Sequence, residues 1–186
     1  EMTELGGMAS NLAEIHPLPI AQLMVEWNFF ADFSPVQLVG LLSCFTDIKL
    51  PSDMRTSRPN CNDTFLNNKI LALEKGYHSY QDQELQDGVN TGIDYNEELC
   101  YDIIDFSMIW CDCTTEYDCK SFIQNEVAEK SISIGDFTKA MLKIVTITKE
   151  FMNIAETIGN VELKHKLNQI EGLVLKYVTT SQSLYV

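Results

Sequence analysis

The feature that most constrains this chain is the spacing of its apolar residues between positions 137 and 158. Side chains that are almost all apolar recur there every three or four residues, which matches one face of an α-helix and does not match the alternation of a strand. The stripe consists of Phe137, Met141, Ile144, Val145, Thr148, Phe151, Met152, Ala155 and Ile158. Gly159 and Asn160 follow it as a typical helix stop. The sequence therefore predicts one long helix close to the C-terminal end.

Helical spacing also covers most of the remaining chain. Ser34, Pro35 and Gln37 form a capping-box pattern before one stripe, and Thr115-x-x-Asp118 forms another before a short helix through Phe122 and Ile123. The further stripes run over 20–30, 38–45, 66–77, 99–110 and 163–178. In the stripe over 99–110 we expect Glu98, Asp102 and Asp105 to face outward. No strand pattern competes, so the predicted fold is an all-α helical bundle with the long helix near its C-terminus, formed as a single domain over 1–186.

Two stretches interrupt the helical pattern. Pro51 to Asn62 holds two prolines and several polar residues, and Gln81 to Asp94 is polar and acidic with two glycines. The first is predicted to be a loop, and the second is predicted to be either a loop or a poorly ordered insert. Together they make residues 51–96 a loop-rich segment within the domain.

Charge is distributed unevenly along the chain. The formal net charge is −14, and the 11 acidic residues between Gly76 and Cys119 stand in a stretch without any Lys or Arg. Phosphate contacts supply most of the affinity of a nucleic-acid-binding domain, so a domain that bound RNA strongly by itself would normally be basic. The acidic stretch is most simply a solvated face. A docking surface for a basic partner is the alternative.

No motif for catalysis or for a cofactor is present. The glycines form neither a phosphate-binding loop nor a dinucleotide-binding turn, and there is no nucleophile elbow. His16, His78 and His165 lack ligand spacing and are interpreted as ordinary surface or boundary residues. We therefore predict no catalytic residue, no cofactor and no metal in this chain. The apolar runs are too short to cross a membrane, and an intracellular location is expected.

Cysteines are numerous but not arranged like zinc ligands. Cys111-x-Cys113 followed by Cys119 lacks the paired C-x2-C spacing, and no histidine lies nearby. We expect the cysteines to be free thiols that pack as small apolar side chains. A metal site between Cys100 and Cys119 is the less favoured alternative.

Several segments of the chain resemble a known family. Leu38 to Phe45 (LVGLLSCF), preceded by Asn28-Phe29-Phe30 and Phe33-Ser34-Pro35, is similar to the opening of the DSHCT domain. That domain is the C-terminal helical domain of DExH-box RNA helicases of the exosome-assisting and superkiller type. The segments around Trp110, from Ile158 to Leu163 and at the terminal Ser183-Leu184-Tyr185-Val186 resemble later blocks of the same family. The resemblance covers about 130 residues, and residues 51–96 diverge from it.

The resemblance implies a place in a larger, ATP-dependent 3′–5′ RNA helicase. The chain would then be the C-terminal part of a protein whose RecA-like core binds ATP and Mg²⁺. The bundle would close over this core, form one wall of the channel for single-stranded RNA, and deliver RNA to a processing or decay complex in the nucleus or the cytoplasm. The long helix corresponds to the family's ratchet helix, which touches RNA bases, and maps to Gly135–Ile158.

Three residues of that helix are the candidate RNA contacts. Lys139, Lys143 and Thr146 follow the spacing i, i+4 and i+7 and share one face. By the resemblance, Lys143 falls on a base-contacting arginine and Lys139 on another basic position, while Thr146 replaces an acid. Lysine lacks the planar fork of arginine and cannot stack on a base as arginine does. The resemblance also implies that the isolated chain binds RNA weakly.

Overall fold

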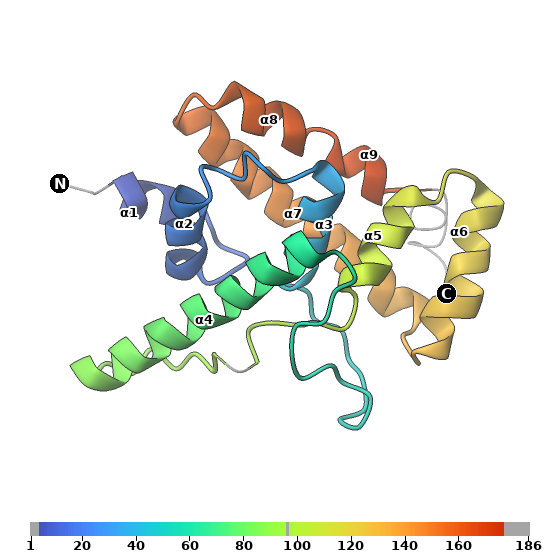
Figure 1. Ribbon diagram of the computed structural model, residues 1–186, viewed down its shortest axis with the longest axis horizontal. Helices are drawn as coiled ribbons and strands as arrows, with labels where there is room; N and C mark the ends of the chain where they lie inside the picture. Colours follow the sequence, from blue (N-terminus) through green and yellow to red (C-terminus); the bar gives the residue numbers. More distant parts are fainter. Residues whose placement is uncertain (1–3, 96, 177–186) are drawn as a thin grey trace.

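The computed structural model describes residues 4–95 and 97–176, and every regular element among them is a helix (Figure 1). The elements in chain order are α1 (Glu4–Ala9), α2 (Pro17–Glu26), α3 (Pro35–Ser43), α4 (Thr64–Asp87), α5 (Ile104–Asp112), α6 (Glu116–Phe122), the π-helical turn η1 (Ile123–Val127), α7 (Ile134–Thr157), α8 (Val161–Leu167) and α9 (Ile170–Val174). The predicted all-α bundle is confirmed. None of the helices described is long and apolar enough to cross a membrane.

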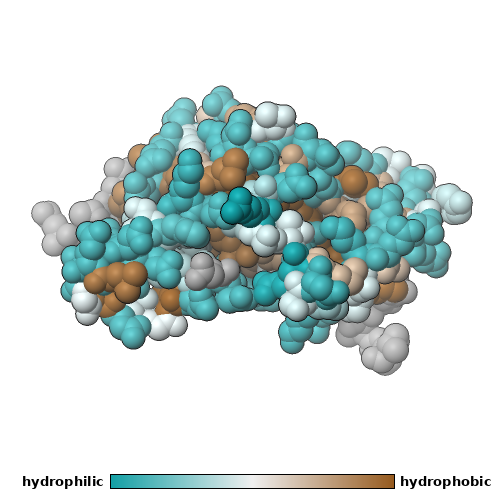
Figure 2. All heavy atoms as spheres, turned by 60° about the horizontal axis from the view of Figure 1, so that its bottom comes forward, coloured by the Kyte–Doolittle hydropathy of each residue, from teal (hydrophilic) through white to brown (hydrophobic). Residues whose placement is uncertain are grey.

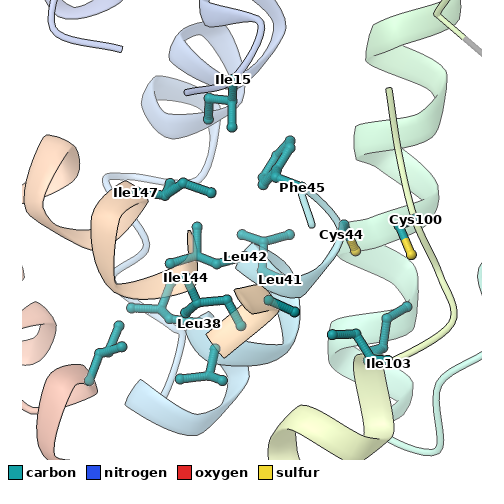
Figure 3. Close-up of a cluster of buried hydrophobic side chains, with 14 of the residues drawn as sticks. Ile15, Leu38, Leu41, Leu42, Cys44, Phe45, Cys100, Ile103, Ile144 and Ile147 are labelled. Carbon is teal, nitrogen blue, oxygen red and sulfur yellow. The ribbon is translucent and has the colours of Figure 1, made fainter. Parts of the chain in front are cut away.

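The long helix α7 is the central element of the bundle. It contacts α3, α8 and α9, and Figure 1 shows these three helices next to it. In the close-up of Figure 3, Leu38, Leu41 and Leu42 of α3 belong to one buried cluster with Ile144 and Ile147 of α7. All five side chains are fully buried. Burying a leucine or isoleucine contributes about 1.5–3 kcal/mol, so this contact fixes α7 firmly in the core.

Side-chain caps start several of the helices where the sequence predicts them. The Ser34 hydroxyl accepts a hydrogen bond from the Gln37 amide at 3.1 Å, and the Ser34 amide donates to the Gln37 side chain at 3.0 Å. Thr115 and Asp118 form the same reciprocal pair before α6. At the other end of α7, Gly159 adopts a positive φ of 69° and ends the helix. Both capping boxes and the glycine stop are therefore confirmed.

Helix α4 is longer than predicted. The predicted loop over 81–94 begins only after Asp87, where Gly88 takes a left-handed φ of 65° as the C-cap. The last buried residue of α4 is Tyr77, so the second half of the helix has no apolar stripe. Hydrophobic periodicity cannot detect a helical segment in which no residue is fully buried, which is why the prediction for this half is wrong. The loop over 51–62 is confirmed.

Helix α5 is shorter than its apolar stripe, because it begins only at Ile104. The prediction that the neighbouring acids face outward is wrong for Asp102, which is 5% exposed and accepts a hydrogen bond from the Thr56 amide at 2.6 Å. Asp105 is half-buried and accepts from the Asn62 amide at 3.1 Å. Glu98 is exposed as predicted. The two aspartates tie down the otherwise irregular loop over 51–62, a role that the helical spacing does not reveal.

Helix α2 ends earlier than its stripe predicts. Asn28, Phe29 and Phe30 follow it with positive φ values of 46°, 53° and 59°. Left-handed backbone is strained for phenylalanine. The fully buried ring of Phe30 offsets part of this strain, and the ammonium of Lys166 donates to the carbonyls of Phe30 and Ala31, both at 2.8 Å.

The last predicted helix, over 163–178, is two helices in the structure. α8 ends at Leu167 and α9 begins at Ile170. Within the described part of the chain α9 ends at Val174, where Lys176 donates to the carbonyls of Trp110 and Cys111 at 2.8 and 2.7 Å. A cation there stabilises the C-terminal end of α5. Tyr177, Val178 and the segment from Ser183 to Val186 lie outside the described residues.

Candidate nucleic-acid interface

The predicted face of α7 is present, but its three residues have different surroundings. Lys139 is largely exposed, with 81% of its side chain accessible, and Thr146 is also exposed. Only 25% of the Lys143 side chain is accessible. Lys143 is therefore the one member of the three that the fold partly encloses.

Lys143 is paired with a carboxylate that the sequence analysis did not identify. Its ammonium nitrogen lies 2.9 Å from an Asp47 carboxylate oxygen, and Asp47 is 83% exposed in the turn that follows α3. Lys143 also lines a cavity of about 240 Å³. The other residues around this cavity are Glu14, Ile15, Phe45, Asp47, Glu97 and Glu98. Four acidic residues and one lysine thus line the same cavity, and Asp47 is the acid at ion-pair distance from Lys143.

Backbone contacts bring these acids together from three distant segments. The Glu150 carboxylate of α7 accepts hydrogen bonds from the amides of Ala13 and Glu14, at 3.1 and 3.4 Å, and holds the N-terminal segment beside α7. The Cys100 amide donates to the Cys44 carbonyl at 2.8 Å, which places residues 97–98 next to the turn of Asp47. Figure 3 shows Cys44 and Cys100 side by side. No local sequence pattern indicates this convergence.

The other two predicted contacts have weaker internal partners. The ammonium of Lys139 lies 3.9 Å from an Asp136 oxygen, at the edge of ion-pair distance. The Thr146 hydroxyl donates to the Leu142 carbonyl at 3.1 Å, one turn earlier in α7. An exposed ion pair contributes at most about 1 kcal/mol, so Lys139 stays available to a ligand. The Thr146 oxygen can still accept a hydrogen bond.

The charge around Lys143 decides what this face can bind. Arg55 pairs with Glu97 at 3.0 Å, but the other three acids still outnumber Lys143, and this negative charge disfavours a phosphate group in the cavity. Carboxylates can accept hydrogen bonds from the amino groups of nucleobases, and an ammonium can donate to their carbonyl oxygens. The chemistry around Lys143 therefore suits the edge of a base better than the backbone of a nucleic acid.

The cysteines do not form a metal site in the described residues. Groups of three or more metal-ligating side chains are absent from them, and all six cysteines are free thiols. Cys111, Cys113 and Cys119 line a cavity of about 530 Å³ together with Lys176. Burial raises the pKa of Cys111 to about 12, although the charge of Lys176 opposes this shift. Because metals bind thiolates, a thiol with so high a pKa is a poor ligand.

Of the three histidines, His16 has the most enclosed surroundings. Its Nε2 lies 3.1 Å from the Tyr95 hydroxyl, which itself donates to Glu84 at 2.6 Å. The His16 ring also packs near Tyr77 and Tyr80. Burial lowers the pKa of His16, and the carboxylates of Glu98 and Glu84 oppose this shift. This cluster joins the N-terminal segment to α4, which makes His16 a structural residue.

Comparison with known proteins gives one finding. A family model described as the DSHCT (NUC185) domain matches residues 1–181. Curated proteins give no match to the chain.

Proposed function

The chain belongs to the DSHCT (NUC185) family, a domain found in DExH-box RNA helicases, and on that premise we propose that it forms one wall of an RNA channel in a parent helicase. In this proposal the chain has no catalytic residue of its own. ATP and Mg²⁺ bind to the RecA-like core of the parent, which moves single-stranded RNA in the 3′–5′ direction. The RNA then passes to an intracellular processing or decay complex.

The observation that carries the proposal is the uninterrupted course of α7. The helix runs for 24 residues from Ile134 to Thr157, with a buried stripe on one side and Lys139, Lys143 and Thr146 on another. Such a helix is rigid because the bundle holds it along its length. A rigid helix with spaced polar groups suits the wall of a channel, where successive bases meet the same side chains.

The acidic surroundings of Lys143 support a contact with bases and a weak affinity for RNA. In a parent helicase the core supplies the phosphate contacts, and α7 only needs to touch the strand that the core already holds. The ion pair between Lys143 and Asp47 is partly exposed and contributes no more than about 1 kcal/mol, so an arriving base can replace it. Lys139 and Thr146 extend the contact by one turn in each direction.

The proposal is tested by RNA unwinding with the parent protein. Lys143→Gln removes the charge while keeping a flexible polar side chain, and we expect the unwinding rate to fall about ten-fold. Lys120→Gln on α6 is the matched control, because this exposed lysine is also paired with a carboxylate, that of Glu116. ATP hydrolysis in the absence of RNA should stay unchanged in both variants. Full unwinding by the Lys143→Gln protein would refute the role of Lys143.

A further inference from the structure

After Tyr80, which still packs against the core, the second half of α4 extends beyond the bundle. None of residues 78–87 is buried, although the helix continues through them to Asp87. In Figure 1 this half of α4 extends away from the other helices, and the segment after it returns alongside. We name residues 81–95 the α4 arm. A helical segment with so little burial gains little stability from its own propensity, so other contacts must hold the arm in place.

Specific contacts order the arm. The Glu84 carboxylate accepts hydrogen bonds from the hydroxyls of Tyr95 and Thr91, at 2.6 and 2.8 Å. The Val89 amide donates to the Glu84 carbonyl at 2.9 Å across the left-handed Gly88. This is the usual geometry of a glycine-capped helix end. The return segment therefore closes against the helix, and the arm has a defined surface.

That surface is apolar at its tip. Leu85 is 74% exposed and Val89 is 53% exposed. Figure 2 shows hydrophobic residues gathered at the end of the molecule where α4 lies, with hydrophilic residues around them. The glycine cap at Gly88 places Val89 directly after the end of the helix that carries Leu85. It does not explain why both remain accessible to water.

The segment that carries these two apolar side chains is acidic. Asp82, Glu84, Asp87 and Asp94 belong to the arm, and no Lys or Arg occurs between Gly76 and Cys119. A surface with an apolar centre and a charged rim of one sign matches a partner with the same pattern and the opposite sign. We propose that the α4 arm is a docking site for a polypeptide segment that presents an apolar side chain flanked by Lys or Arg residues.

Charge argues against the other kinds of occupant. The arm would repel the phosphates of RNA and the head groups of anionic lipids. A second copy of this chain carries the same net charge of −14 and would present acids to acids. The inference does not depend on the proposed RNA channel, because the arm shares no residue with the exposed face of α7.

The test measures peptide binding to the full chain by fluorescence anisotropy. The probe is a synthetic 12-residue peptide, with a central Leu-Val pair flanked by arginines on both sides. The arm variant is Leu85→Asp with Val89→Asp. Its matched control is Tyr117→Asp with Val161→Asp, because these side chains are 80% and 77% exposed at other places on the surface. Both variants add the same negative charge to the protein, and circular dichroism checks that both keep their helices.

Because the arm variant is more negative, non-specific attraction and docking on the arm predict opposite changes in its affinity for the peptide. Non-specific attraction of a basic peptide to an acidic protein predicts tighter binding to both variants. Docking on the arm predicts that the arm variant binds the peptide about ten-fold more weakly, because the apolar contact is lost. The control variant should bind as tightly as the unmodified chain, or more tightly.

Three results would overturn the inference: no binding of the peptide to the unmodified chain, equal or tighter binding to the arm variant, or an equal loss in both variants. RNA unwinding by a parent protein with the arm variant should stay unchanged. That readout separates a failure of this inference from a failure of the RNA-channel proposal.

Discussion

Lys143 and Asp47 are separated by 96 residues in sequence, and their charged groups lie 2.9 Å apart in the structure. The pair joins the middle of α7 to the turn after α3, on the face proposed to meet RNA. Since Asp47 is 83% exposed and Lys143 only 25%, water screens the carboxylate far more than the ammonium. The pair therefore lowers the effective positive charge of this face, and a ligand can still displace Asp47 from Lys143.

Removing the carboxylate should expose that positive charge. We expect Asp47→Asn in the parent helicase to tighten its binding to single-stranded RNA about two- to five-fold, the range set by the loss of a partly exposed ion pair. The measurement is the dissociation constant at low salt, with Asp82→Asn on α4 as the control of equal charge change. Weaker RNA binding by the Asp47→Asn protein would contradict this account of the pair.

Gly40 in α3 allows a close approach of two neighbouring helices. A β-carbon there would lie 2.6 Å from a methyl group of Leu66 and 2.9 Å from the sulfur of Met108. We expect Gly40→Ala to lower the free energy of unfolding by about 1 kcal/mol, because overpacking outweighs the better helix propensity of alanine. Gly172→Ala in α9 is the control, since nothing lies within 4 Å of its β-carbon.

For the control we expect unchanged stability or a gain of up to about 1 kcal/mol. Urea denaturation of both variants measures the difference. If Gly40→Ala were as stable as Gly172→Ala, then α3 would not be in close contact with Leu66 and Met108.

The buried carboxylate of Asp102 should be important for stability. Asp102→Ala leaves the Thr56 amide without its acceptor, which costs about 1–3 kcal/mol for a buried group. Asp102→Asn keeps an oxygen at the same place and should cost less. Thermal unfolding ranks the variants, and hydrogen exchange at the Thr56 amide should accelerate in the alanine variant alone. Equal exchange in both would mean that the loop over 51–62 does not depend on this bond.

The folded chain should become less stable in mild acid, because His16 becomes protonated there. Burial lowers the pKa of His16 in the folded chain below its ordinary value of about 6.5. Between these two pKa values the unfolded chain binds more protons than the folded chain, so protonation favours unfolding. The contribution of His16 is complete above about pH 6.5 and is lost as the pH falls below that value.

The measurement compares the melting temperatures of the unmodified chain and of His16→Gln at pH 7.5 and pH 5.5. Glutamine can still form a hydrogen bond with Tyr95 but does not titrate. The unmodified chain should lose more stability than the variant on acidification. The reverse result would mean that Glu84 and Glu98 stabilise a charged His16, so that their effect exceeds that of burial.

The parts of the fold that could be predicted are those with a local cause. The stripe of α7, the capping boxes at Ser34 and Thr115 and the stop at Gly159 all depend on residues within a few positions of each other. The half of α4 after Tyr77 could not be predicted, because periodicity reports burial and no residue of this half is fully buried. Asp102 was predicted to face outward for the same kind of reason, since its partner Thr56 lies 46 residues away.

For the candidate RNA face, the sequence alone determined that Lys139, Lys143 and Thr146 share one side of a long helix, because helical spacing is a property of the chain itself. The tertiary structure alone decided that Lys143 lies among Glu14, Asp47, Glu97 and Glu98 while Lys139 stays open to solvent. Electrostatic interactions depend on distance in space, and packing of the N-terminal segment, the turn after α3 and residues 97–98 around α7 sets those distances.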